Sequence, residues 1–259
     1  MSTRGEVHTS AGRLGVQQCA EGSLKFLRRW ARVFRGAHSV SVADSLSRQV
    51  MEALAGHGCA VCRLTATAML RRLGFLFHES VNDPDFREEV RCAGGFCPRH
   101  SALVDLHADA LGIAIIMEDV VRTQIEQLRR WAHELRKPRA NKCACPLCRA
   151  EEADERLFAS ALIQALKSHE GAALYQRGDG LCGRHTRLAM EEADANVRKL
   201  IVQTEIRVLE SLAHDLSEFV RRCDYRFAGE QNGEERDAGT RALQKTAGSL
   251  PGNEKRTLA

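Results

Sequence analysis

The feature that most constrains this chain is a pattern of cysteine and histidine residues that occurs twice. In each copy a Cys-x2-Cys pair is followed, after a long interval, by a Gly-x-Cys-x2-His segment. The first copy contains Cys59, Cys62, Cys97 and His100, and the second contains Cys145, Cys148, Cys182 and His185. The Cys-x2-Cys pairs lie 86 residues apart and the Cys-x2-His pairs lie 85 residues apart. Such a close repeat of order and spacing indicates an internal duplication, so we predict one Cys3His metal site in each copy.

The residue types indicate which metal these sites would hold. Thiolates and imidazole are ligands that Zn²⁺ prefers, and four protein ligands make a closed tetrahedral site of the structural kind. The Cys-x2-Cys spacing lets both thiols face one ion. We therefore predict two bound zinc ions. The interval between the half-sites is longer than in a zinc finger or a zinc ribbon, so each ion is expected to hold helices together.

An iron–sulfur cluster is the alternative metal group. Thiolate-rich sites also suit such clusters, and Cys92 and Cys143 lie close enough in sequence to supply a further thiol. The Cys-x2-Cys-x2-Cys run of ferredoxins is absent. A c-type haem is excluded, because Arg63 and Arg149 stand where the haem-attachment histidine would be needed.

Composition favours an all-α protein in a reducing compartment. Hydrophobic residues make up 44% of the 259 residues but aromatic residues only 5%, whereas strands favour aromatic and β-branched residues. The chain has no apolar run long enough to span a membrane and no signal-peptide core near its start. Ten cysteines without an export signal favour metal or redox chemistry over disulfides. We therefore expect a bacterial-type cytoplasmic location.

The duplication predicts a helical bundle made of repeated units. We expect a disordered tail at 1–20, N-terminal helices at 21–58, the first repeat at 59–137, the second repeat at 138–227 and a mostly disordered tail at 228–259. In each repeat a long helix should follow the Cys-x2-His segment, over about 98–135 and 186–222, and these two helices are expected to pack together. Apolar residues at helical spacing predict the buried face of the first one. They include Leu103, Leu106, Ile113, Met117, Val120, Val121, Ile125 and Leu128.

The paired motifs and the segment Cys223-Asp224-Tyr225-Arg226-Phe227 resemble a bacterial family of unknown function. Its members carry tandem Cys-x2-Cys motifs and an Asp-Tyr-Arg-Phe tail, and the resemblance covers about residues 40 to 245. It implies no catalytic residue. The family pattern also implies a basic residue and a histidine before the Asp-Tyr-Arg-Phe run, where this chain has Arg222 and Cys223.

The remaining polar residues give no positive support for an enzyme. The chain has no Gly-rich phosphate loop, no Ser-His-Asp arrangement and no nucleophile elbow. His107 is interpreted as a surface or otherwise satisfied histidine, and Glu118, Asp119 and Glu205 as solvated acids. A di-metal carboxylate centre would need Glu-x2-His on two helices, and the pattern is absent where it would be required.

Three functions remain for a chain with this pattern. The favoured one is a cytoplasmic zinc-binding helical adaptor or accessory protein that binds another macromolecule, with a protein as the expected partner. The alternative is an iron–sulfur or redox accessory protein that serves an oxidoreductase or metallocentre assembly. The third is a nucleic-acid-binding regulatory factor, because Leu-Arg-Arg-Trp-Ala occurs at 27–31 and again at 128–132. The net charge of +4 is modest for that third function.

Overall fold

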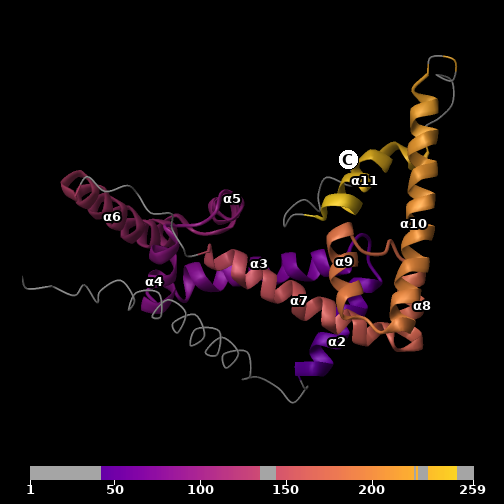
Figure 1. The fold of residues 1–259 in the computed structure, drawn as a ribbon, viewed down its shortest axis with the longest axis horizontal. Coiled ribbons are helices and arrows are strands. Elements are labelled where there is room, and N and C mark those ends of the chain that lie inside the picture. The colour runs from indigo at the N-terminus through magenta and orange to yellow at the C-terminus, as the bar shows by residue number, and fades with distance from the viewer. Residues whose placement is uncertain (1–41, 135–143, 225, 227–232, 250–259) are drawn as a thin grey trace, which may run out of the picture. The chain divides into compact units, whose positions relative to one another are not determined.

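The computed structural model describes residues 42–134, 144–224, 226 and 233–249 (Figure 1). These residues form ten α-helices and a short 3-10 helix, with no strand among them. The predicted all-helical class is therefore confirmed. The expected N-terminal tail, the first Leu-Arg-Arg-Trp-Ala segment and Cys143 lie outside the described residues.

The helices follow one another closely along the chain. They are α2 (Val42–Leu54), α3 (Ala60–His78), α4 (Pro84–Ala93), α5 (Pro98–His107), α6 (Ala110–Glu134), α7 (Pro146–Leu166), α8 (His169–Arg177), α9 (Gly183–Glu192), α10 (Ala195–Arg222) and α11 (Ala238–Ala247). The 3-10 helix η2 (Glu234–Asp237) leads into α11. Both elements lie in the segment expected to be mostly disordered. No helix in the described part of the chain is long and apolar enough to cross a membrane.

The helices form two compact units, and each unit draws on both predicted repeats. Among the described residues, unit 1 contains 72–134 and 144–150, and unit 2 contains 42–71, 151–224, 226 and 233–249. The boundaries fall inside α3 and α7. Unit 1 therefore has the end of α3 and the start of α7, and unit 2 has the start of α3 and most of α7.

Aromatic side chains pack together at the end of α3 in unit 1. The ring of Phe77 lies 6.3 Å from that of Phe86 in α4 and 6.1 Å from that of Phe96, the residue before Cys97. α4 also packs against α6, and Arg87 of α4 donates to Asp119 of α6 at 2.6 Å. The interpretation of Asp119 as a solvated acid is wrong, because the carboxylate bridges two helices.

The larger core lies in unit 2 and combines α2, the start of α3, α7, α8, α9 and the first turns of α10. A charged group is buried beside it. Glu205 of α10 accepts hydrogen bonds from Tyr175 Oη and the Leu181 amide, each at 2.7 Å, and its other oxygen lies 2.6 Å from Lys245 Nζ of α11. Burial and the Glu205 charge raise the pKa of Tyr175, which keeps its hydroxyl a donor. The interpretation of Glu205 as a solvated acid is therefore also wrong.

Each predicted long helix is in fact two helices. The helical conformation is interrupted at Ala108-Asp109, between α5 and α6, and at Ala193-Asp194, between α9 and α10. These two interruptions are called the helix breaks. At each break an aspartate caps the second helix: Asp109 accepts from the Gly112 amide at 2.8 Å, and Asp194 accepts from the Val197 amide at 3.0 Å. Ala-Asp-Ala occurs at both breaks. An N-cap aspartate satisfies amides that have no partner within the helix, and this signal identifies the breaks in the sequence.

The break also corrects the predicted buried face. Leu106 is 70% exposed, and Val121, Ile125 and Leu128 of α6 are exposed as well. The buried residues of α6 include Ile116 and Val120. Because α5 ends at His107 and α6 begins at Ala110, the apolar positions of the two helices do not share one helical periodicity. A single buried face therefore cannot continue from α5 into α6. α6 lies in unit 1 and α10 in unit 2, and the packing of these helices on each other stays a prediction.

Removing the cap at one break tests this account of the fold. We expect Asp109→Ala to lower the free energy of unfolding by about 1 kcal/mol, the usual cost of losing an N-cap. Asp109→Asn is the matched control, because asparagine caps equally well, and it should change little. Urea denaturation followed by circular dichroism measures both. Equal losses in the two variants would show that the cap does not stabilise the break.

Candidate metal centres

All four half-sites have the same local structure at the start of a helix. Cys97 and Cys182 are the N-cap residues of α5 and α9, with nearly identical backbone angles (φ −69°, ψ 162° and φ −71°, ψ 160°). Cys59 and Cys145 immediately precede α3 and α7. The second ligand of each half-site is three residues later, in the first helical turn. Helix N-termini stabilise nearby negative charge, so every half-site presents its sulfur where a thiolate is favoured.

Glycines before three of the half-sites set the direction in which the chain enters the helix. Gly58, Gly95 and Gly180 have φ values of 76°, 109° and 69°, in the left-handed region where other residues are strained. This requirement explains the glycine of the Gly-x-Cys-x2-His pattern. At Gly180 a side chain would also collide with the Glu205 carboxylate.

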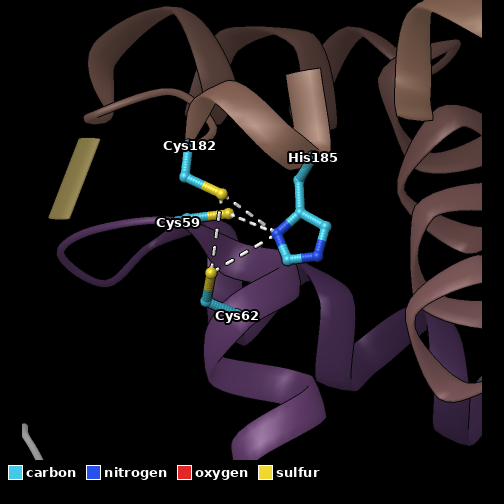
Figure 2. A group of neighbouring side chains, drawn as sticks. All are labelled: Cys59, Cys62, Cys182 and His185. Atoms are coloured by element: carbon cyan, nitrogen blue, oxygen red, sulfur yellow. Dashed lines mark hydrogen bonds between the residues drawn. The ribbon is translucent and has the colours of Figure 1, made fainter. Parts of the chain in front are cut away.

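The structure gathers all eight predicted ligands into two tetrads, but it pairs the half-sites differently from the prediction. The unit 2 tetrad consists of Cys59, Cys62, Cys182 and His185, and the unit 1 tetrad consists of Cys97, His100, Cys145 and Cys148. Figure 2 shows the unit 2 tetrad, with two ligands from the start of α3 and two from the start of α9. The prediction that each repeat closes its own site is therefore wrong. Each Cys-x2-Cys pair meets the Cys-x2-His pair of the other repeat.

Helix length explains this exchange. α3 has 19 residues and is about 28 Å long, whereas α4 has 10 residues and is about 15 Å long. The chain after α3 therefore does not return to the start of α3 before it reaches Cys97. The packing of Phe96 on Phe77 shows that Cys97 lies near the end of α3 instead. α7 and α8 repeat this difference, with 21 and 9 residues.

The donor atoms of the unit 2 tetrad are spaced as a tetrahedral zinc site requires. The sulfurs of Cys59, Cys62 and Cys182 lie 3.4, 3.3 and 3.2 Å from Nδ1 of His185, and those of Cys62 and Cys182 lie 3.7 Å apart. Zn–S bonds of about 2.3 Å and Zn–N bonds of about 2.0 Å imply S–N and S–S separations of about 3.5 and 3.8 Å at tetrahedral angles. The four donors therefore fit one zinc ion with adjustments of a few tenths of an ångström.

The unit 1 tetrad has a similar geometry and is more accessible. Nδ1 of His100 lies 3.3 Å from the sulfurs of Cys97 and Cys148 and 3.7 Å from that of Cys145. His100 is buried, but the three cysteines are only half-buried, whereas all four residues of the unit 2 tetrad are buried. Both tetrads can hold a metal ion, and they differ in how far solvent reaches their sulfurs.

A carboxylate lies behind the histidine of unit 2. Nε2 of His185, which points away from the sulfurs in Figure 2, lies 3.4 Å from Oε1 of the buried Glu155. Glu155 also accepts a 2.5 Å hydrogen bond from Arg184. Burial opposes protonation of His185, but the Cys182 and Cys62 sulfurs and Glu155 outweigh it and raise its pKa to about 11. A carboxylate on the outer nitrogen of a metal-binding histidine fixes the ring and makes it a stronger ligand.

A cation takes the corresponding place in unit 1. Nε2 of His100 lies 3.3 Å from the guanidinium of Arg99. Burial and this charge lower the pKa of His100 to about 4. Arg99 and Arg184 are equivalent in the two copies, so their different neighbours separate the two sites. An offset of 86 residues places Met69 at the position equivalent to Glu155, and for this reason the repeat pattern gave no sign of the carboxylate.

The thiols in each tetrad are not electrostatically equivalent. Hydrogen bonds from the Cys59 and Cys62 thiols lower the pKa of Cys182, whereas burial raises that of Cys59. In unit 1, burial opposes ionisation of Cys97, but the His100 amide and the neighbouring thiols lower its pKa, whereas burial raises that of Cys148 to about 12. The lowered thiol in each tetrad is the N-cap cysteine of the Cys-x2-His half.

The end of α11 covers the unit 2 tetrad. Gly248, the residue after α11, lies so close that an added side-chain carbon would be 3.3 Å from the Cys62 sulfur and 3.4 Å from the Cys182 sulfur. Lys245 anchors this end of α11, because its ammonium group contacts Glu205 and donates to the Asp179 carbonyl at 2.9 Å. Gly248, Lys245 and Glu155 were not predicted as part of the site, since none of them belongs to the repeated pattern.

The other candidate residues lie apart from the tetrads. The Cys92 thiol donates to Glu88 at 3.3 Å and belongs to neither tetrad. His107 is exposed, as predicted for a surface histidine. Glu118 is exposed and pairs with Arg122 at 2.7 Å along the same helix, which agrees with its interpretation as a solvated acid.

Comparison with known proteins identifies the family. The model of a family of unknown function, DUF6062, matches residues 47–253. The chain belongs to this family. It is also 26% identical over 175 residues to an uncharacterized 23.9 kDa protein from the xynA 3' region of Caldicellulosiruptor sp. (strain Rt8B.4), a match that covers 65% of this chain and 83% of that protein. No solved structure matches the chain. The expected resemblance to a family of unknown function is therefore confirmed.

The exchanged pairing predicts which peptides can be joined by disulfides. Mild oxidation of the folded, metal-free chain with diamide should join sulfurs that are already close. We expect tryptic peptide 49–63 to be linked to 178–184, and 92–99 to 143–149. Mass spectrometry of the digest identifies the links. Links between 49–63 and 92–99 as the main product would contradict the observed tetrads.

Proposed function

We propose that the protein is a zinc-binding helical adaptor that holds its helices in place with two ions and binds a partner protein. The observation that carries this proposal is the convergence of two helix N-termini at each tetrad, with three sulfurs and one nitrogen at tetrahedral spacing. A donor set of this kind, filled by four protein side chains, is that of a structural zinc site.

The tetrads support zinc over an iron–sulfur cluster. Each provides three thiols and an imidazole around a volume that fits a single ion, and Cys92 does not supply a fourth thiol to the unit 1 tetrad. The iron–sulfur alternative predicts a brown protein, whereas the zinc proposal predicts a colourless one. An absorption spectrum of protein purified without oxygen decides between them.

An apolar stripe on α10 supports a protein partner. Val202, Ile206, Leu209 and Val220 are each more than 40% exposed. The first three follow a four-then-three spacing, which places them on one side of the helix. A nucleic acid would require cations in such a place, whereas apolar side chains favour the side chains of another protein. Arg129 and Arg130 of the second Leu-Arg-Arg-Trp-Ala segment are exposed on α6, which keeps nucleic-acid binding as the lesser alternative.

Metal counting in paired variants tests the zinc sites and their connectivity together. We expect two zinc ions per chain in the wild type, one in Cys59→Ser/Cys182→Ser and none in Cys59→Ser/Cys97→Ser. The first pair removes ligands from one tetrad and the second removes one ligand from each. Plasma emission spectrometry of purified protein measures the zinc content, and Cys223→Ser, an exposed cysteine outside both tetrads, should keep two ions.

The structural role of the ions has its own expected outcome. Binding of a structural zinc ion contributes about 10–16 kcal/mol to folding in small domains, so chelation should lower the unfolding temperature and the helical signal of this chain. A wild-type protein that contains no metal, or whose unfolding is unchanged by chelation, would contradict the proposal.

The apolar stripe is tested by comparing two variants in the native cell. Ile206→Asp/Leu209→Asp should lose a partner protein that wild type retains on affinity purification, while its zinc content and helicity stay unchanged. Arg207→Asp, on the adjacent side of α10, is the matched control and should retain the partner. Identical co-purified proteins for wild type and the stripe variant would contradict a role for this face.

A further inference from the structure

The two tetrads have the same ligands but different surroundings. We propose that the unit 1 site exchanges its ion with soft-metal ligands in solution, such as small thiols and chelators, whereas the unit 2 site keeps its ion. This inference rests on the proposed function, because it requires that both tetrads bind zinc. It assigns different tasks to the two ions: the unit 2 ion stabilises the fold, and the unit 1 ion is available for transfer.

Access to the sulfurs is the first difference. Ligand exchange at a four-coordinate ion begins when an incoming donor approaches the ion or one of its ligand atoms. Cys97, Cys145 and Cys148 are half-buried, so a small thiol reaches them from solvent. In unit 2, Cys182 is 1% exposed, and Cys59 and Cys62 are each 7% exposed. An incoming ligand would first have to move the protein atoms that cover these sulfurs.

The cover over unit 2 is a fixed part of the fold. Gly248 lies beside the sulfurs of Cys62 and Cys182, so near that a side-chain carbon added there would be 3.3 and 3.4 Å from them. Three contacts hold α11 in this position: Lys245 with Glu205, Lys245 with the Asp179 carbonyl, and Arg241 with Asp215 at 3.1 Å. Since Glu205 is buried and also binds Tyr175 and Leu181, displacing α11 would leave a buried carboxylate without its cation. Loss of one partner of a buried ion pair strongly destabilises a fold, so we expect α11 to stay in place over the unit 2 sulfurs.

The outer nitrogens of the two histidines are the second difference. When Nδ1 binds a metal, a neutral imidazole carries its proton on Nε2. In unit 2 this nitrogen lies 3.4 Å from Oε1 of Glu155, and a carboxylate offers acceptors. In unit 1 it faces Arg99, and a guanidinium offers only donors. Carboxylates next to a metal-binding histidine typically strengthen metal binding 10- to 100-fold, so we expect Glu155 to favour metal binding in unit 2, whereas the positive charge of Arg99 beside His100 gives no such gain in unit 1.

Release of zinc to a chromogenic pyridylazo chelator tests the proposal with the full chain loaded with two equivalents. We expect two phases of equal amplitude, with rates that differ at least about tenfold. The fast phase should disappear in Cys97→Ser, which then carries one ion and releases it slowly. The slow phase should disappear in Cys182→Ser.

A milder substitution tests whether the slow phase comes from the unit 2 tetrad, even if Cys182→Ser fails to fold. Glu155→Gln keeps the shape of the side chain but removes its charge, and it should accelerate only the slow phase, by about 10- to 100-fold. Glu152→Gln is the matched control, because Glu152 lies on the same helix in an exposed pair with Arg156, and it should leave both rates unchanged.

The outcomes separate this inference from the proposed function. A chain that binds no zinc contradicts both. A chain that binds two ions and releases them in one phase supports the zinc sites and overturns the division between them. A fast phase that persists in Cys97→Ser, or a slow phase that Glu155→Gln leaves unchanged, also overturns the division.

Discussion

Two helix N-termini meet at each tetrad, and this convergence is the constraint on which the rest of the structure depends. Three thiolates held within 4.8 Å of one another repel strongly unless a cation compensates them. The N-terminal ends of two helices supply part of this compensation, and a divalent ion would supply the rest. The first cysteine at each helix start and the second ligand one turn later give every half-site the same geometry. Four copies of one local structure therefore suffice to build two sites.

The exchanged pairing makes each tetrad a long-range constraint. In unit 2, Cys62 and Cys182 are 120 positions apart in the chain, and in unit 1, His100 and Cys148 are 48 positions apart. Fixing such distant segments removes much of the freedom of the unfolded chain. The unit 2 tetrad also lies in the largest core, beside Leu181 and Ile201, whereas the unit 1 tetrad is closer to solvent. This difference in burial is the basis of the division of tasks that we propose for the two sites.

Residue type and spacing along the chain predicted the helical class and singled out the eight residues that form the two tetrads. The pairing of the half-sites was not predicted, because the number of residues between two motifs does not say where the chain runs in space. The difference in length between α3 and α4 decides that Cys97 lies near the end of α3. This difference is seen only in the structure. The helix breaks at Asp109 and Asp194 had a local signal, the repeated Ala-Asp-Ala, which the apolar periodicity concealed. Glu155 and Gly248 had no such signal, since each acts through a contact between distant segments.

X-ray diffraction from crystals of the protein at the zinc absorption edge tests the central claim most directly. The account predicts two anomalous peaks per chain, each with three Zn–S bonds of about 2.3 Å and one Zn–N bond of about 2.0 Å. One peak should lie among Cys59, Cys62, Cys182 and His185, and the other among Cys97, His100, Cys145 and Cys148. A peak that joins Cys59 and Cys62 to Cys97 and His100, or the absence of any peak at the tetrads, would contradict it.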